Sequence, residues 1–595
     1  MDGANKRHSA PTSLPACSNP GVCAHWQVIM TSRTFLFQVA FLNPAPRPLS
    51  VFLLCCYVLA VAVGAACMMS AHSYIAGFSG ADEPSHFLNG YFISNYLKAH
   101  FGSNPLAFAT DYYIHYPKIS IGHWPPAYYG ILGLLFLVVP ATYPWMFALN
   151  VMLASLPAVA VAMALARLQG RRIAVLGVIV YMITPLVAEG QIMFMVDQPL
   201  AACLLAATVT WIAYATRQTW ARALGFAALA ALAVLIKGNG WIAALIPVFH
   251  VALTGRWRLL FSMKLIVAGV IGALVVVPWY LVTAKISAGG FNYQAGLPYA
   301  WQALSTNLIF LSSNLSLPGM ALALFAIVAE WRTRLVDPAR WNIVAGMIAL
   351  TLATLALQSI VPVDIVDRYM APALPAMLVL ALMGTWRVVA YAMSRTPDRR
   401  HAPWCVAAGA VIVIVMLAPG VEHIATRLPK SDVGAPATAA LIAPGASPSI
   451  TVVDGSAGYE GAMIAAAAVN DPHLRGYIVR SSKILADSNF MGTTYALKFA
   501  SNAQVLGELA RLGVKSVVLV RARDLPAFPH SVQLLAALTA PGSGYHLLKR
   551  IPHHGRPGST DIYQADLVPV PNIALVRSMG MPAKAPLTAQ SSPGV

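Results

Sequence analysis

Two adjacent acids stand out in a chain that carries few charges. Asp82 and Glu83 lie in the stretch AGFSGADEPSHFLNGYF, directly after a long apolar run, while only 10% of the 595 residues are charged. A positioned carboxylate can take the proton of an attacking hydroxyl group, which is general base catalysis. The pair would also stabilise a helix N-terminus, because the helix dipole favours negative charge there. The pattern of the following residues predicts such a helix directly after the acids.

A second polar stretch follows in the same loop. The segment DYYIHYPKISIGHWPPAYYG, from Asp111 to Gly130, crowds tyrosine, histidine, lysine and tryptophan ahead of another apolar run. Aromatic residues of this kind form belts at membrane surfaces. Lys118 and His123 add hydrogen-bond donors that suit a phosphate group. The sequence therefore predicts a polar site to which both stretches contribute.

Composition places these residues beside a membrane. Hydrophobic residues make up 58% of the chain and the mean hydropathy is +0.66, too apolar for a soluble globular protein. The net charge of +18 fits basic cytoplasmic loops and anionic lipid, so no nucleic-acid partner is expected. The seven cysteines lie in the N-terminal tail or in apolar runs without metal-type spacing, so neither disulfides nor a cysteine metal site is expected.

Apolar runs long enough to cross a bilayer predict about eleven membrane helices. The run 126–139 is short and flanked by prolines, and we interpret it as an interfacial helix. With that choice the basic clusters fall in alternate loops on one side, which predicts a cytoplasmic N-terminus and an extracytoplasmic loop over 72–143. The predicted spans are 51–71, 144–166, 173–189, 198–215, 221–236, 240–254, 265–284, 308–329, 342–361, 370–391 and 404–420.

This topology places most of the remaining polar residues on the extracytoplasmic face. Ionisable groups at membrane positions are costly and often functional. Each one alone has a plain structural explanation, such as an interfacial cap or a snorkelling base, and only their shared side favours a site. The residues are Asp82, Glu83, Lys118, His123, Asp197, Lys237, Asp364, Asp367 and Arg368.

After the last predicted span the composition becomes that of a soluble domain. Apolar runs such as SITVVD and VKSVVLV alternate with helical patterns, which predicts a small extracytoplasmic α/β domain over 421–570. The glycines of DGSAGYEG indicate a strand-to-helix turn there rather than a nucleotide site. The other predicted parts are a cytoplasmic tail over 1–49, a transmembrane domain over 50–420 and a disordered tail over 571–595.

Several short motifs, taken in their order along the chain, resemble glycosyltransferase family 39 of the GT-C membrane enzymes. That family includes protein O-mannosyltransferases and lipid A aminoarabinose transferases. The likeness covers about residues 50–420. It rests on the acid pair in the first outer loop, the prolines and tyrosines of Pro125 to Tyr129, MFMVDQPLA at 193–201, LIKGNG at 235–240, VPWY at 277–280 and DRYMAPALP at 367–375.

The resemblance implies transfer of a sugar from a polyprenyl-phosphate carrier to an extracytoplasmic lipid, glycan or protein, with inversion at the anomeric carbon. It makes Asp82 the general base, and Glu83 either a partner of the acceptor or the residue that orders the loop. The implied location is the bacterial inner membrane, with the C-terminal domain in the periplasm. Substrate contacts are expected from Glu83, His86, His123, Tyr128 and Asp197, and phosphate contacts from Lys118, Lys237, Arg368 and Tyr369.

One position departs from the family pattern. Where the aminoarabinose transferases carry E-K-P-P, this chain has His123-Trp124-Pro125-Pro126, so the acid and the phosphate-binding lysine are missing. Aminoarabinose transfer to lipid A is therefore the less expected activity. The sequence leaves open whether the protein depends on a divalent metal, which His123 could bind. Two rival functions remain. A transporter or flippase of lipid-linked sugars is disfavoured because no internal repeat is visible, and the sequence leaves open a non-catalytic scaffold of the same fold.

Overall fold

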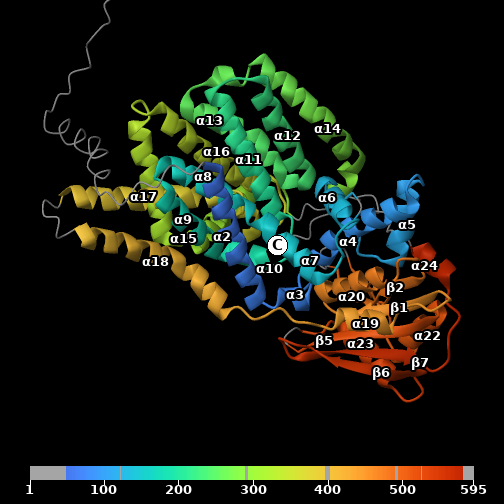
Figure 1. Cartoon of the computed structure of the whole chain (residues 1–595). Coiled ribbons are helices and arrows are strands. Elements are labelled where there is room, and N and C mark those ends of the chain that lie inside the picture. Colours follow the sequence, from blue (N-terminus) through green and yellow to red (C-terminus); the bar gives the residue numbers. More distant parts are fainter. Residues whose placement is uncertain are drawn as a thin grey trace, which may run out of the picture.

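The computed structural model describes residues 49–120, 122–288, 293–395, 402–488, 494–523 and 526–579. In these ranges the chain forms a large helical bundle and a smaller α/β domain that lies beside one end of it (Figure 1). The predicted cytoplasmic tail, apart from Leu49, and the last part of the predicted disordered tail lie outside the described residues.

Helices that could cross a membrane make up the bundle. By length and composition, eight single spans qualify among the described residues, and α9 (Arg171–Ile183) with α10 (Pro185–Ile192) would be a further span bent by 64°. The eight are α2 (Leu49–Ser70), α7 (Tyr143–Ala154) continued by α8 (Leu156–Leu168), α11 (Asp197–Thr216), α14 (Met263–Ala288), α15 (Leu297–Thr333), α16 (Pro338–Ile360), α17 (Leu374–Arg395) and α18 (Ala402–Thr426).

Two shorter apolar stretches complete the bundle. They are α12 (Trp220–Ile236) and η3 (Gly238–Trp241) with α13 (Ile242–Thr254), and they fall on the predicted spans 221–236 and 240–254. The chain reverses sharply between them because Gly240 lies against the backbone of Ala233, where a side chain would collide. This reversal fixes the position of Lys237 at the turn.

The predicted outer loop between α2 and α7 is built from short helices. They are α3 (Ser73–Ala76), α4 (Glu83–Asn95), η2 (Tyr96–His100), α5 (Pro105–His115) and α6 (Ala127–Leu135). The acid pair opens α4, with Asp82 at the N-cap position and Pro84 in the first turn, as the sequence predicts. With nine residues α6 is too short to cross a bilayer, which agrees with the interpretation of 126–139 as a segment that does not span.

The C-terminal domain contains a five-stranded sheet of order β2-β1-β5-β7-β6. The strands β1 (Ser449–Asp454), β2 (Gly476–Arg480) and β5 (Val514–Ala522) are parallel, and the hairpin of β6 (Tyr545–Pro552) and β7 (Gly558–Ala565) is antiparallel at one edge. The parallel strands are buried along most of their length, as expected for strands covered on both faces. The helices of the domain are α19 (Ala435–Leu441), α20 (Ala457–Asn470), α21 (Ser481–Ile484), α22 (Asn502–Leu512) and α23 (Pro529–Thr539), and β3 (Ala486–Asp487) pairs with β4 (Ala496–Leu497).

The end of the domain differs from the prediction. Part of the predicted disordered tail forms α24 (Ile573–Met579), whose Val576 is buried in the domain core. The apolar residues of this short helix pack against the domain. The prediction of disorder rested on the Pro- and Ala-rich residues that follow the helix in the sequence.

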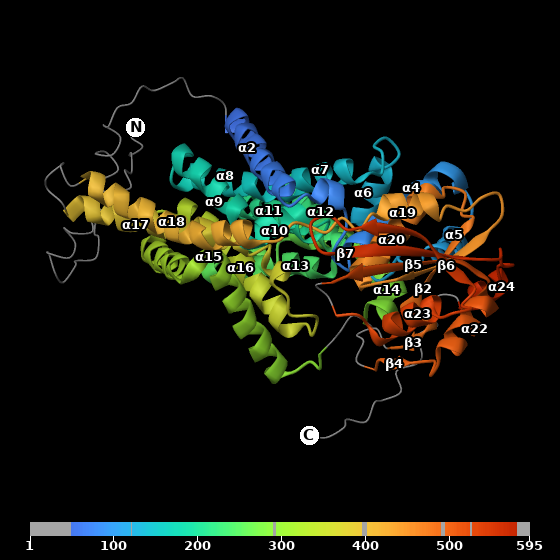
Figure 2. The same cartoon turned by 90° about the horizontal axis from the view of Figure 1, so that it is seen from below.

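The domain docks directly on the loop that carries the acids. In α20, Gly458 lies against the backbone of Ser79 and Gly80, and Gly461 lies against Pro84 and Lys118, so a larger side chain at either glycine would force the elements apart. Figure 1 shows α20 next to α4 at the boundary between the domain and the bundle, and in Figure 2 the domain again lies beside one end of the bundle. The first turn of α4 is therefore held between the bundle and the domain.

Candidate active site

Asp82 forms an ion pair at the edge of the bundle. Nη2 of Arg368, from η5 (Asp367–Met370), donates to Oδ2 of Asp82 over 2.9 Å, and 34% of the aspartate and 32% of the arginine side chain remain exposed. Burial acts to raise the pKa of Asp82, but the charge of Arg368 in particular outweighs it, and the pKa lies below its ordinary value. Asp82 is therefore ionised at neutral pH and reachable from outside, as a general base must be.

A second ion pair lies deeper beside the first. Asp197, the first residue of α11, accepts a hydrogen bond from Nζ of Lys237 at 2.6 Å, and both side chains are nearly buried. The ammonium group of Lys237 also lies 4.5 Å from the ring centroid of Tyr369, and the guanidinium of Arg368 lies 5.8 Å from the same ring. Tyr369 thus joins the two pairs into one cluster.

Arg368 has unused hydrogen-bonding capacity. Its Nε is buried and has no hydrogen-bond partner among the described residues. Its Nη2 donates to Asp82, and its Nη1 contacts Sδ of Met195 at 3.8 Å. Burial acts to lower the pKa of Arg368, but the carboxylates of Asp197 and Asp82 raise it above its ordinary value. A fixed cation with free donors is suited to a phosphate group.

His86 lies next to this cluster inside an aromatic cage. Its Nδ1 shares a hydrogen bond of 2.7 Å with the hydroxyl of Tyr129, and its ring centroid is 4.4 Å from that of Trp124. Burial lowers the pKa of His86 to about 3, so the ring is neutral, while Asp82 remains near enough to act on that pKa. A neutral imidazole can orient a hydroxyl but does not carry charge.

His123 and Tyr128, which were also predicted as substrate contacts, lie against the aromatic cage. His123 meets Trp124 edge-on at 5.2 Å between ring centroids, and Tyr128 meets Tyr129 at 5.7 Å. The hydroxyl of Tyr128 is buried and has no hydrogen-bond partner among the described residues, and burial raises its pKa. Both residues therefore contact the aromatic side chains that surround His86.

Lys118 faces the C-terminal domain. Its Nζ donates to the carbonyl oxygen of Ala457, at the start of α20, over 3.2 Å. Burial and the charge of Arg480 lower the pKa of Lys118 to about 8, against the opposing charges of Glu460 and Asp82. The lysine thus lies between the domain and the acid cluster.

Glu83 is fully buried and has every oxygen engaged. Oε1 accepts from the backbone amides of Ser79 at 3.0 Å and Gly80 at 2.7 Å, and Oε2 accepts from the amide of Phe194 at 2.8 Å. Nζ of Lys430 donates to Oε2 at 2.9 Å and also to the carbonyl oxygen of Ile192 at 2.9 Å. This geometry favours the loop-ordering role of Glu83 over a contact with substrate, because no carboxylate oxygen faces outward.

Lys430 was not predicted from the sequence as a site residue. It stands alone in RLPKSD just after α18, where a single lysine is typical of a snorkelling base. In the structure its ammonium lies 4.7 Å from the ring centroid of Phe147, and burial lowers its pKa although Glu83 acts to raise it. The sequence points to Lys430 only through the predicted topology, which puts it on the extracytoplasmic side of the membrane together with Asp82 and Glu83.

Metal ligands do not converge in the described part of the chain. No group of three or more histidine, cysteine, aspartate or glutamate side chains could hold a metal ion among these residues. The two carboxylates of the cluster are paired with Arg368 and Lys237 instead. Arg368 and Lys237 thus place positive charge beside these carboxylates.

A family model matches part of the chain. The model of dolichyl-phosphate-mannose-protein mannosyltransferases matches residues 123–281, from the loop before α6 into α14. The matched stretch includes Asp197 and Lys237 but not Asp82 or Arg368. No sequence among curated proteins matches this chain.

Solved structures match over most of the chain. The apo crystal structure of ArnT from Cupriavidus metallidurans has a TM-score of 0.52 at 14% identity, covering 87% of this chain and 98% of that one. The apo oligosaccharyltransferase of Archaeoglobus fulgidus has a TM-score of 0.50 at 13% identity, covering 78% and 69%. At such identities the likeness shows the fold alone. The predicted fold class, a polytopic helical bundle with a C-terminal α/β region, is confirmed.

The buried pair of Glu83 and Lys430 generates the first prediction. Lys430→Met leaves a buried carboxylate without its cation, and Glu83→Gln leaves a buried ammonium without its anion. Each is expected to destabilise the protein by about 3–5 kcal/mol. Thermal unfolding of the detergent-purified chain measures the loss of stability. Lys549→Met, the same substitution at an exposed position of β6, is the control and should change stability little.

A double variant tests whether the two side chains act on each other. Glu83→Gln with Lys430→Met removes both charges, so its loss should be smaller than the sum of the single losses. Strictly additive losses would contradict a direct pairing.

Proposed function

We propose that this chain, which has the fold of the GT-C membrane glycosyltransferases, moves a sugar from a polyprenyl-phosphate carrier to a hydroxyl group of an acceptor. The observation that carries the proposal is the cluster of an exposed, ionised Asp82 with Arg368 and Lys237 at one end of the bundle. The name of the matching family model, which speaks of dolichyl-phosphate-mannose as donor and protein as acceptor, supports a lipid-phosphate donor.

The cluster supplies the groups that such a transfer needs. Asp82 accepts the proton of the acceptor hydroxyl while the oxygen of that hydroxyl forms a bond to the anomeric carbon. The bond between that carbon and the phosphate oxygen breaks, and the carrier leaves as polyprenyl phosphate. Arg368 and Lys237 stabilise the negative charge that develops on the phosphate. A single displacement of this kind inverts the anomeric carbon.

The remaining predicted residues receive supporting roles in the proposal. Tyr369 keeps the two cations side by side, and Lys118 adds a third donor from the domain side. Asp197 holds Lys237 in place. Neutral His86 orients the acceptor or the sugar, with His123 and Tyr128 shaping the wall behind it.

Sugar transfer is separable from the rival functions by product analysis. Purified protein given polyprenyl-phosphate-linked hexose or pentose donors and an extract of lipid, glycan and protein acceptors should release polyprenyl phosphate together with a glycosylated product. A flippase would move the donor across vesicles without consuming it, and a scaffold would leave it unchanged. Mass spectrometry of the lipid-linked pool detects consumption of the donor, and the sidedness of the unconsumed donor in vesicles separates a flippase from a scaffold.

The proposed location is the bacterial inner membrane, with the acid cluster and the α/β domain in the periplasm. The alternation of basic loops supports this orientation. A reporter that is active only outside the cytoplasm, inserted after residue 445 between α19 and β1, should be active. The same reporter after residue 170, between α8 and α9, should be inactive. The reverse pattern would overturn the orientation.

Loss of the proposed base should nearly abolish turnover. Asp82→Asn keeps the shape of the side chain and removes its basicity, which typically costs about 10²–10⁴ in rate. Donor binding and thermal unfolding should change little. Asp364→Asn, an acid of the loop before η5, is the matched control and should retain activity. A folded and fully active Asp82→Asn protein would place the base elsewhere, with Asp197 as the next candidate.

Arg368 should set the pH at which the base works. Its charge holds the pKa of Asp82 below the ordinary value, whereas burial acts to raise that pKa. In Arg368→Gln burial acts with less opposition, so the pKa of Asp82 rises and the acidic limb of kcat/KM moves to higher pH. Arg368→Lys should keep the limb near its original place. The pH profile decides this, because a lost phosphate contact lowers the rate without moving the limb.

A further inference from the structure

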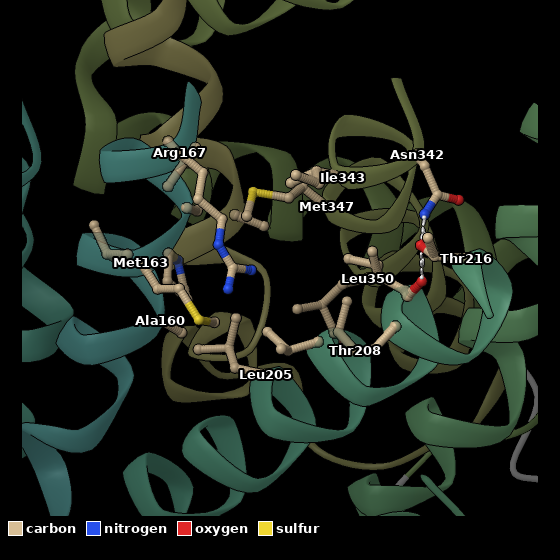
Figure 3. Close-up of a pocket in the computed structure, with 18 of the residues that line it drawn as sticks. Ala160, Met163, Arg167, Leu205, Thr208, Thr216, Asn342, Ile343, Met347 and Leu350 are labelled. Atoms are coloured by element: carbon tan, nitrogen blue, oxygen red, sulfur yellow. Dashed lines mark hydrogen bonds between the residues drawn. The ribbon is translucent and has the colours of Figure 1, made fainter. Parts of the chain in front are cut away.

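A cavity of about 590 Å³ lies inside the bundle, away from the acid cluster. Helices α8, α11, α16 and α17 contribute its walls, and Figure 3 looks into it. On α11 the two sites lie apart, because Asp197 is its first residue whereas the residues that line the cavity run from Leu205 to its last residue, Thr216. Twenty helical residues at about 1.5 Å each separate these ends by roughly 30 Å.

The cavity is apolar over most of its depth. On α11 its lining residues recur on one helical face from Leu205 to Thr216, and Met163 of α8 and Met347 and Leu350 of α16 lie around them (Figure 3). At about 1.5 Å per residue this wall is roughly 16 Å deep. That depth is about half of the ~30 Å hydrocarbon core of a bilayer. It therefore suits an apolar chain that belongs to one leaflet.

Positive charge marks the end of the cavity that is remote from Asp197. Arg167, Arg222 and Arg256 line it, and no carboxylate is found among the described lining residues. Arg222 uses its Nη1 to cap the carbonyl oxygens of Ala213 and Arg217. Arg167, at the end of α8, points its guanidinium into the cavity (Figure 3).

Arg167 lacks a counter-charge in the described part of the chain, where its side chain makes no hydrogen bond or ion pair. The apolar side chains of Met163, Leu205 and Met347 line the same cavity (Figure 3). A cation in such surroundings favours an anionic group, and a guanidinium binds the oxygens of a phosphate in pairs. The cavity thus offers guanidinium groups at one end, Arg167 among them, and an apolar channel beyond them.

We propose that this cavity binds one acyl chain of an anionic membrane phospholipid, with the lipid phosphate on Arg167. The depth of one leaflet fits an acyl chain, whereas a long polyprenyl chain would exceed it. The predicted topology makes this end cytoplasmic, where basic groups meet anionic headgroups. The bound chain fills the space between α8, α11, α16 and α17 and so stabilises the bundle.

The test measures thermal unfolding of the full chain in detergent with added phosphatidylglycerol or phosphatidylcholine of the same acyl chains. A ligand of the folded state raises the unfolding temperature, and phosphatidylglycerol should raise it more. Arg167→Ala should abolish the difference between the two lipids. Arg172→Ala removes an equal charge from the following helix, outside the cavity lining, and should keep the difference.

A second variant keeps the charge and fills the space. Ala160→Phe adds bulk at a lining position of α8, so native mass spectrometry should find the retained phospholipid on the original protein and lose it in this variant. An equal response to phosphatidylglycerol in the original protein and Arg167→Ala would overturn the proposal. A larger response to polyprenyl phosphate than to phosphatidylglycerol would also overturn it, by assigning the cavity to the carrier lipid. No outcome depends on sugar transfer.

Discussion

The ion pair of Glu83 and Lys430 is the constraint on which the arrangement of the site depends. A buried pair is costly unless its remaining hydrogen-bonding groups are satisfied. Here three backbone amides and the ammonium surround the carboxylate, and the ammonium also reaches the carbonyl of Ile192 and the ring of Phe147. The pair thereby ties the first turn of α4, the segment before α11 and the start of the C-terminal domain to one point.

This anchor explains why two acids stand together. Side chains of neighbouring residues at a helix start point in different directions, so Glu83 faces the interior while Asp82 faces Arg368. The anchored segment from Ile192 to Phe194 also leads directly into α11, whose first residue is Asp197. One buried carboxylate thus sets the position of both ion pairs, and α20 closes over the same turn through two glycines.

Much of this could be predicted because it is local. The apolar runs, the start of α4 at the acids and the parallel strands follow from residue patterns within single segments, and the shared side of Asp82, Asp197, Lys237 and Arg368 follows from the basic loops. The sequence could not tell which of the two acids is buried. That depends on Lys430, a partner 347 residues further along the chain. Nor could it show that His86 meets Trp124 and Tyr129, since these contacts come from the packing of α4 against α6 and the segment that leads into it.

The two ion pairs of the cluster differ in exposure, and the difference suits the proposed reaction. Opening a pair that is one third exposed costs little, whereas opening a buried pair costs several kcal/mol. An incoming sugar phosphate would therefore compete for Arg368 rather than displace Lys237 from Asp197. As the guanidinium turns to the phosphate, Asp82 loses the charge that keeps its pKa low while its burial remains. The carboxylate would then become a stronger base when the donor is in place, so donor binding itself prepares the step that deprotonates the acceptor.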